Sequence, residues 1–177
     1  WGRLGGGDLS MNQRENIHAT AITIDSHGIL IRGVSGSGKS LLALYLLDLY
    51  GARGREVALV ADDRVDLEHH DDHVILSPPK TIAGLIELRG RGIIRRPSVE
   101  AVHLALVVDL VPELIRMPDD TAFSTSIFGI PVPRCPVSQA GIIELEPQRL
   151  LIEAALDALS SRSGVRQFIH FHIGRRG

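Results

Sequence analysis

Residues 33–40 are the part of the chain with the clearest capacity for chemistry. They match the phosphate-binding pattern G-x-x-x-x-G-K-[ST], the P-loop, at every fixed position. The glycines of this pattern let the backbone curl so that successive N–H groups face phosphate oxygens, and the lysine adds a positive charge. Residues 29–32 read as a strand and those after the pattern as a helix, whose N-terminus favours an anion. We therefore predict that a nucleotide binds to Gly33, Val34, Ser35, Gly36, Ser37, Gly38, Lys39 and Ser40.

Such a loop also needs an acidic group beside it, because the accompanying metal ion is held in part by a carboxylate at the end of an apolar strand. The apolar residues 57–61 end in Asp62 and Asp63, and the apolar residues 104–108 end in Asp109. The double carboxylate is the stronger candidate. If the strand alternation continues, one side chain faces the phosphates and the other supports it from behind. For Asp109 we expect a structural role.

A carboxylate near the phosphates can also be the base that takes a hydroxyl proton during phosphoryl transfer. The pair Asp62 and Asp63 therefore favours a kinase over a GTPase-type switch. The chain lacks the glycine-rich loop, the H-R-D motif and the D-F-G motif of eukaryotic-type protein kinases, which excludes that class.

The elements that must position these residues follow an α/β pattern. Alternation and turn residues predict a β-hairpin over residues 20–32 and a second hairpin over residues 64–76. Continuous apolar runs predict buried strands at residues 57–61 and 102–108. The predicted helices lie at residues 40–50 with a stop at Gly51, at residues 81–88 and at residues 147–160.

The remaining segments have weaker patterns. Residues 110–126 are polar and contain prolines, and we expect a mobile or partner-facing segment there. Residues 129–137 read as extended, and residues 142–145 as a further strand. Together these elements predict the α/β class, with a single P-loop-containing domain built on a mixed central sheet and flanking helices.

The length of the chain and the composition of its ends indicate the extent of this domain. The 177 residues suffice for one domain with a proper core. We assign residues 16–160 to the domain. Residues 1–15, which are rich in glycine, are set apart as a disordered N-terminus or an expression remnant, and residues 161–177 as a frayed tail.

Charge and cysteine content narrow the environment of the protein. A formal net charge of −2 offers no general electrostatic case for a nucleic acid or membrane partner. Cys135 is the only cysteine, which excludes an intrachain disulfide and suits a reducing compartment. No apolar run reaches membrane-spanning length, so the expected location is the cytoplasm.

Two groups of histidines raise the question of a metal site. They are His69, His70 and His73, and His170 with His172. No cysteine or acidic pattern closes a zinc site around either group, so the sequence favours no metal there.

Four separated blocks within residues 16–159 resemble the catalytic domain of bacterial HPr kinase/phosphorylase. They are Ile17-His18-Ala19, the P-loop, Leu-Val-Ala-Asp-Asp-Arg-Val at residues 59–65, and Ile-Glu-Leu-Arg-Gly-Arg-Gly-Ile-Ile at residues 86–94. Residues 130–133, Ile-Pro-Val-Pro, match as well. Many families share the loop, but the third and fourth blocks in this order are highly specific.

The resemblance implies an HPr kinase catalytic-domain fold and an ATP- and Mg²⁺-dependent kinase. Its substrate would be a seryl residue of HPr, the small phosphocarrier of the sugar phosphotransferase system, or of a paralogue of HPr. The family assembles as a hexamer, so a homo-oligomer is implied.

The resemblance also implies a role for individual residues. The P-loop binds ATP, with Lys39 catalytic, and Ser40 and Glu87 are ligands of Mg²⁺. Asp63 is the proton acceptor, and His18 pairs with that carboxylate. The remaining residues of the implied site are Asp62 and Arg89, in supporting positions, and Arg116, matched to a later active-site arginine of the family.

The chain departs from the family in one segment that matters for function. The family's P-V-R-P-G-R segment, associated with phosphorylase activity, stands here as Pro-Val-Ser-Gln-Ala-Gly at residues 136–141, without either arginine. The resemblance therefore supports the kinase reaction and leaves the phosphorylase reaction open. Two other classes also stay open: a small-molecule P-loop kinase and a non-catalytic ATP-binding regulator.

Overall fold

The structure is a computed structural model that describes residues 13–141 and 144–172, with side chains described as far as Ser161. The helices are α1 (Lys39–Ala52), α2 (Leu145–His172) and a 3₁₀ turn at Asp120–Phe123. The strands are β1 (Arg14–Ile17), β2 (Thr20–Ile24), β3 (His27–Arg32), β4 (Val57–Ala61), β5 (Val65–His70), β6 (His73–Ser77), β7 (Leu85–Leu88), β8 (Gly92–Arg95), β9 (Val102–Val111), β10 (Ser124–Ile127) and β11 (Ile130–Ser138).

The main sheet is mixed, which confirms the predicted fold class. Its strands lie in the order β1-β5-β6-β9-β3-β2-β4. Strand β9 is parallel to β3 and, along its second half, to β11, whereas it meets β6 antiparallel at its first two residues. The hairpins β2–β3 and β5–β6 are antiparallel, as predicted, and β4 pairs with the outer side of β2.

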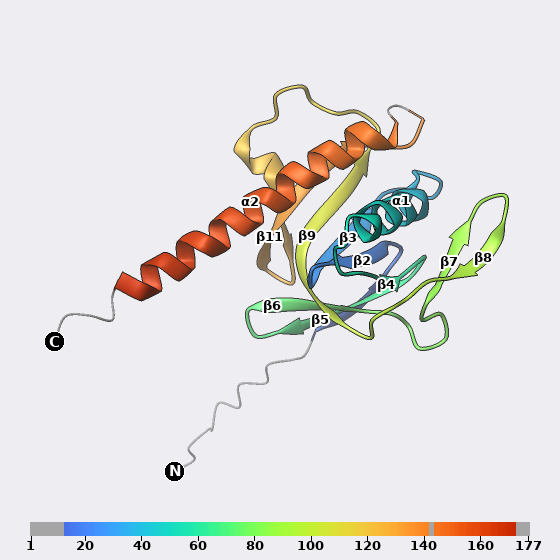
Figure 1. Ribbon diagram of the computed structural model, residues 1–177, viewed down its shortest axis with the longest axis horizontal. Helices are drawn as coiled ribbons and strands as arrows, with labels where there is room; N and C mark the ends of the chain where they lie inside the picture. The colour runs from blue at the N-terminus through green and yellow to red at the C-terminus, as the bar shows by residue number, and fades with distance from the viewer. Residues whose placement is uncertain (1–12, 142–143, 173–177) are drawn as a thin grey trace, which may run out of the picture.

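Two hydrophobic cores lie on opposite faces of this sheet, because successive strand residues point to opposite sides. On one face, Leu42 and Leu46 of α1 and Ile152 of α2 pack with Ile29 and Ile31 of β3. On the other face, β5 and β6 curl beneath the central strands and bury a second apolar cluster. Figure 1 shows α2 running across β9 and β11, and β5 and β6 below them. No helix in the described part of the chain combines the length and the apolar character that crossing a membrane requires.

Helix α1 is a nearly all-apolar helix because it is buried between the sheet and its neighbours. Its buried side chains include Leu42, Leu46 and Tyr50. The predicted stop at Gly51 is wrong by a few residues: the helix runs to Ala52, and Gly54, with φ of 77°, lies just beyond it. Gly51 stays helical, and a Cβ there would stand 3.3 Å from Cγ2 of Val57. The glycine therefore allows the helix to lie close to β4.

The helix predicted at residues 81–88 is wrong, because Leu85–Leu88 forms β7, which pairs antiparallel with β8. Gly84, Gly90 and Gly92 adopt positive φ on both sides of β7, and this leaves too few residues for a helix to persist. Ile86 is buried and the next residue, Glu87, is exposed, as alternation in a strand requires.

Four segments also differ from the sequence prediction. Residues 110–126 contain the end of β9, the 3₁₀ turn and β10, so this segment has more structure than expected. Helix α2 continues through residues predicted to be a frayed tail, as far as His172. Of the strand predicted at residues 142–145, residues 142 and 143 lie outside the described part of the chain, and Leu145 begins α2. Arg14 and Glu15 belong to β1.

Asp109 joins the strands that lead into the P-loop. Nε and Nη2 of Arg32 donate to its two carboxylate oxygens at 2.7 and 2.9 Å, and Nε of Arg134 donates at 2.5 Å. Burial acts to raise the pKa of Asp109, but the two guanidinium groups outweigh it and hold that pKa below its ordinary value. Because Arg32 immediately precedes Gly33, this ion cluster anchors the loop to β9 and β11. Asp109 therefore has the structural role that the sequence favours.

We expect Asp109→Asn to lower the free energy of unfolding near pH 7 by about 2–3 kcal/mol, since two partly buried guanidinium groups lose their counter-charge. A carboxylate whose pKa is depressed by folding stabilises the protein above its unfolded pKa, about 3.9, and this contribution is lost as the pH falls through the folded pKa. Thermal unfolding curves of wild type and variant should therefore converge in acid. Asp48→Asn, which removes an exposed partner of Arg96, is the control and should change little. A gap that stays constant with pH would contradict the assignment.

Candidate active site

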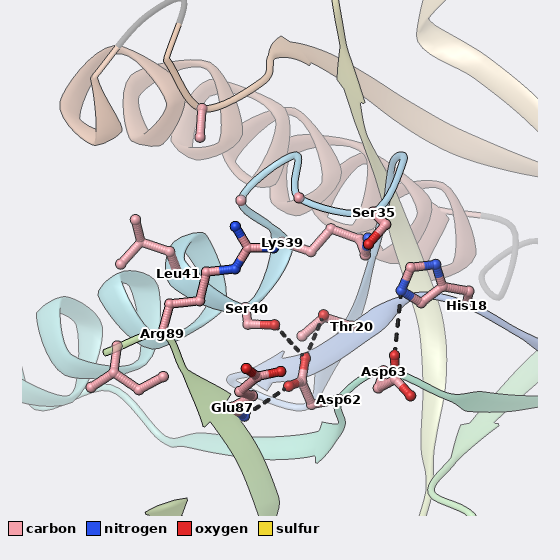
Figure 2. A pocket seen from close by; sticks show the side chains of 14 residues that line it. His18, Thr20, Ser35, Lys39, Ser40, Leu41, Asp62, Asp63, Glu87 and Arg89 are labelled. Atoms are coloured by element: carbon pink, nitrogen blue, oxygen red, sulfur yellow. Dashed lines mark hydrogen bonds and ion pairs between the residues drawn. The ribbon is translucent and has the colours of Figure 1, made fainter. Parts of the chain in front are cut away.

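A cavity of about 340 Å³ lies where the P-loop, the start of β2, the end of β4 and the end of β7 meet. Residues from five separate parts of the chain line it, including His18, Lys39, Asp63 and Glu87. Figure 2 shows these side chains directed toward a common space. The structure thus brings together most of the residues that the sequence singles out.

The P-loop has the form that its glycines predict. Gly38 adopts φ of 98°, and a Cβ on it would lie 2.6 Å from Cβ of Ala140, so both backbone conformation and space require glycine. Nζ of Lys39 donates to the carbonyl oxygens of Gly33 and Val34, each at 3.0 Å, and so closes the loop on itself. Lys39 is only 6% exposed, and burial lowers its pKa while the charges of Asp62 and Asp63 oppose that change. An anion in the loop would add a counter-charge for Lys39 to those of Asp62 and Asp63.

Asp62 is the buried centre of the site. Its Oδ1 accepts hydrogen bonds from the hydroxyls of Thr20 at 2.7 Å and Ser40 at 2.8 Å, and its Oδ2 accepts from the backbone N–H of Glu87 at 3.0 Å. Three elements, β2, α1 and β7, are therefore tied to one carboxylate at the end of β4. This carboxylate fixes where the Ser40 hydroxyl and the β7 backbone stand.

Asp63 is placed quite differently from its neighbour. Its side chain is 74% exposed, and its Oδ1 lies 3.4 Å from Nε2 of His18. Asp63 adopts φ of 64°, a left-handed conformation that aspartate tolerates better than most residues. Strand β4 ends at Ala61, so the expected alternation does not continue, and both carboxylates line the same cavity. Asp62 faces its interior and Asp63 its open side.

The β7–β8 hairpin contributes two side chains to the site. Figure 2 shows Glu87 directed into the cavity below Ser40 and beside Asp62. Arg89 comes from the turn of the hairpin, and its Nη2 is 3.6 Å from where a Cβ on Gly36 would stand. The guanidinium group thus lies against the P-loop, where it can meet a bound phosphate.

One predicted site residue is not part of this arrangement. Arg116 is exposed in the segment after β9 and does not line the cavity. Its assignment stays a prediction. The histidine clusters likewise form no metal centre: among the described residues no group of three or more His, Cys, Asp or Glu side chains is arranged to hold an ion. The side chains of His170 and His172 lie outside the described part.

Sequence reasoning missed Thr20, Leu41 and Ala140, all of which line the cavity. Thr20 stands two residues after His18, a spacing that places both on one side of an extended chain. Ala140 lies in the segment that departs from the P-V-R-P-G-R pattern, and its N–H donates to the carbonyl of Ser37 at 2.9 Å. No local pattern marks Ala140, because its role depends on the parallel pairing of β11 with β9.

A family comparison agrees with this site. The model of the HPr Serine kinase C-terminal domain matches residues 9–137 of the chain. The chain belongs to this family. The match contains every residue that lines the cavity except Ala140, and it confirms the resemblance drawn from the four sequence blocks.

Similar proteins support the assignment to the HPr kinase family. An HPr kinase/phosphorylase of Lacticaseibacillus casei strain BL23 is 33% identical over 142 residues, covering 73% of this chain and 43% of the relative. That of Clostridium tetani is 34% identical over 110 residues, covering 62% and 34%. The chain therefore spans less than half the length of these curated relatives.

A solved structure, the HPr(Ser) kinase/phosphatase from Coxiella burnetii, matches with a TM-score of 0.69 and 31% identity. The match covers 89% of this chain and 98% of that one. The likeness extends to a whole protein chain of similar size, and the fold described above is the fold of an HPr kinase.

Proposed function

We propose that this protein is an ATP- and Mg²⁺-dependent serine kinase whose substrate is a seryl residue of an HPr-type phosphocarrier. The observation that carries the proposal is the position of Asp63, an exposed carboxylate paired with His18 at the open side of a P-loop cavity. A base placed there can reach a hydroxyl on a large partner. The names of the similar proteins support HPr as that partner.

The residues present fit both cofactors. The glycine-lined loop with its buried lysine matches a triphosphate, and Arg89 adds a second positive charge beside it. The oxygens of Ser40 and Glu87, with Asp62 behind Ser40, form the hard donor set that Mg²⁺ prefers. Mg²⁺ is commonly held by only one or two carboxylates together with substrate phosphates, so a complete protein-built site is not required. When bound, Mg²⁺ offsets negative charge on the phosphates.

Different residues of the chain have different roles in the in-line transfer of the phosphoryl group. Lys39 and Arg89 hold the phosphates by charge, and Asp62 orients the Ser40 hydroxyl. Asp63 accepts the proton of the attacking seryl hydroxyl as the new O–P bond forms, while the bond from the γ-phosphorus to the bridging oxygen breaks and ADP leaves. His18, 3.4 Å from Asp63, orients that carboxylate.

The family resemblance also supports a homo-oligomer, a hexamer in the family, and a cytoplasmic location. The proposal covers the kinase direction. Ser138 and Gly141 stand where the family's phosphorylase segment has arginines, so we do not extend it to the reverse reaction.

The proposal is tested by an acceptor assay. We expect the purified protein, given ATP, Mg²⁺ and HPr, to add a single phosphate to an HPr serine, located by mass spectrometry of the product. Omitting Mg²⁺ should abolish the product, and HPr with its phosphorylated serine changed to alanine is the matched control. Turnover of ATP with a small-molecule acceptor alone would show a different kinase. Bound ATP with no transfer to intact HPr would show a regulator without this activity.

A further inference from the structure

Positive charge without an acidic partner gathers on the β7–β8 hairpin. Most arginines whose side chains the structure describes contact an acidic side chain, as Arg32 and Arg149 do. Arg89, Arg91 and Arg95 are exposed, and within the described part of the chain no carboxylate lies at ion-pair distance from them. The formal net charge of the whole chain is −2, so this basic surface is a local feature.

The hairpin stands apart from the main sheet. Figure 1 shows it projecting from one side of the molecule, and in the described chain its two strands pair only with each other. Its inner face is covered: Ile86 and Ile94 lie opposite each other, and both pack against the core that includes α1. A two-stranded sheet is marginally stable alone, so this contact holds the hairpin in place.

The outer face of the hairpin continues from the phosphate cavity. Successive strand residues alternate between faces, so Glu87, its partner Ile93, and Arg95 opposite Leu85 share this face. Glu87 lines the cavity, whereas Ile93 is 72% exposed. The face therefore presents an apolar side chain with a guanidinium group beside it. An apolar centre with a charged rim is typical of protein–protein contact surfaces.

The hairpin lies beside the place where an acceptor protein is expected. Asp63 and the end of β7 line the same cavity, so a protein that presents a serine to Asp63 is brought next to the hairpin. An acidic partner at this place meets the carboxylate of Asp63, which repels it. Exposed guanidinium groups offset that repulsion and attract carboxylates on the partner.

We propose that Arg91, Ile93 and Arg95 form a docking surface for the acceptor protein, and that this surface favours a serine flanked by acidic side chains. The inference rests on the proposed function. Arg89 is not part of the surface, because it lies against the P-loop. Charges at the rim of an interface act on the encounter between the two proteins more than on the chemical step. The surface therefore governs KM for the acceptor and leaves kcat unchanged.

The test is steady-state kinetics with Mg²⁺-ATP and HPr as the acceptor, at about 0.05 M and about 0.5 M salt. For the double variant Arg91→Gln/Arg95→Gln we expect KM for HPr to rise about five- to tenfold at the lower salt and about twofold or less at the higher, where exposed charges are screened. The values of kcat and of KM for ATP should stay within about twofold of wild type, since neither residue lines the phosphate cavity.

The matched control is Arg14→Gln/Arg53→Gln. It removes two charges from exposed residues outside the cavity, and KM for HPr should not change. A variant of the acceptor then tests the acidic contact. HPr in which the acidic side chains nearest the phosphorylated serine are changed to amides should show a raised KM with wild type. With the double variant the same change should have little further effect, because the interaction is already lost.

Contrary results separate the possible errors. If the double variant has the wild-type KM for HPr at both salt concentrations, the docking surface is wrong while the proposed function stands. An equal rise of KM in the control variant would show a general charge effect and overturn the surface as well. A comparable rise of KM for ATP would assign the arginines to the nucleotide. Additive losses in the combination with amide-substituted HPr would overturn the acidic contact. If wild type transfers no phosphate to HPr, the proposed function fails and the docking surface with it.

Discussion

Asp63→Asn should remove phosphoryl transfer to HPr while leaving Mg²⁺-ATP bound. The amide cannot accept a proton, so we expect the rate of transfer to fall by about 10²- to 10⁴-fold, the range typical for loss of a general base. Asparagine suits this test because it also tolerates the left-handed φ of 64° at this position. The backbone that carries the side chain is therefore preserved. Transfer is measured by single-turnover assay with HPr, and nucleotide affinity by calorimetry.

The thermal stability of the variant is the control for this experiment, because Asp63 is exposed. Its side chain is 74% exposed, and its described contact is with His18, so the variant should unfold at the wild-type temperature. A loss of activity accompanied by a lower Tm would mean that the side chain is structural. Full transfer by Asp63→Asn, at unchanged nucleotide affinity, would remove Asp63 from the mechanism and leave His18 or a group on HPr as the base.

The same substitution at the preceding residue should have a different result. Asp62→Asn puts an NH₂ group among three donors, the hydroxyls of Thr20 and Ser40 and the backbone N–H of Glu87. The amide oxygen can serve only part of this set, and a donor is left facing a donor in a buried site. We expect the free energy of unfolding to fall by about 2–4 kcal/mol, or Tm by roughly 5–12 °C for a chain of this size.

Asp62→Asn should also weaken Mg²⁺-dependent binding of ATP, because Ser40 loses the partner that orients its hydroxyl. Thermal unfolding with and without Mg²⁺-ATP measures both effects in one experiment. Thr20→Val is the matched control: it removes one of the three donors and should cost less stability than Asp62→Asn. A stable Asp62→Asn protein with normal Mg²⁺ dependence would show that these hydrogen bonds do not organise the site.

Asp62 and Asp63 are adjacent residues of one type, yet Asp62 is buried and Asp63 is exposed. The local sequence pattern predicts only part of this difference. The apolar run at residues 57–61 and the two carboxylates after it predict a strand that ends at a phosphate site, and β4 confirms this. Strand alternation predicts that only one carboxylate faces the site. The chain leaves the strand at Ala61 and turns at Asp63 into positive φ, so both face it. Backbone conformation after a strand depends on what the chain meets next, which here is the start of β5.

The β7–β8 hairpin shows a second reason why local sequence patterns do not predict all of the secondary structure. Its likeness to the family identifies the residues of this segment, yet the local pattern predicts a helix, which is wrong. Four apolar and acidic residues carry too short a pattern to separate period 2 from period 3.6. Pairing with β8 makes this segment a strand. The resulting hairpin places Glu87 in the cavity and Arg89 against Gly36.

By itself, the sequence determined the features that depend on neighbours along the chain. These are the P-loop, the hairpin before it, the helix after it and the strand that ends in two carboxylates, because each arises from local spacing and local backbone preference. Only the tertiary structure decided what joins them. Asp62 gathers hydroxyls from Thr20 and Ser40, Ala140 leaves no room for a side chain at Gly38, and Gln148 donates to the carbonyl of Ser138. These contacts depend on which strands pair and how helices cover the sheet, and such long-range packing has no signature in local spacing.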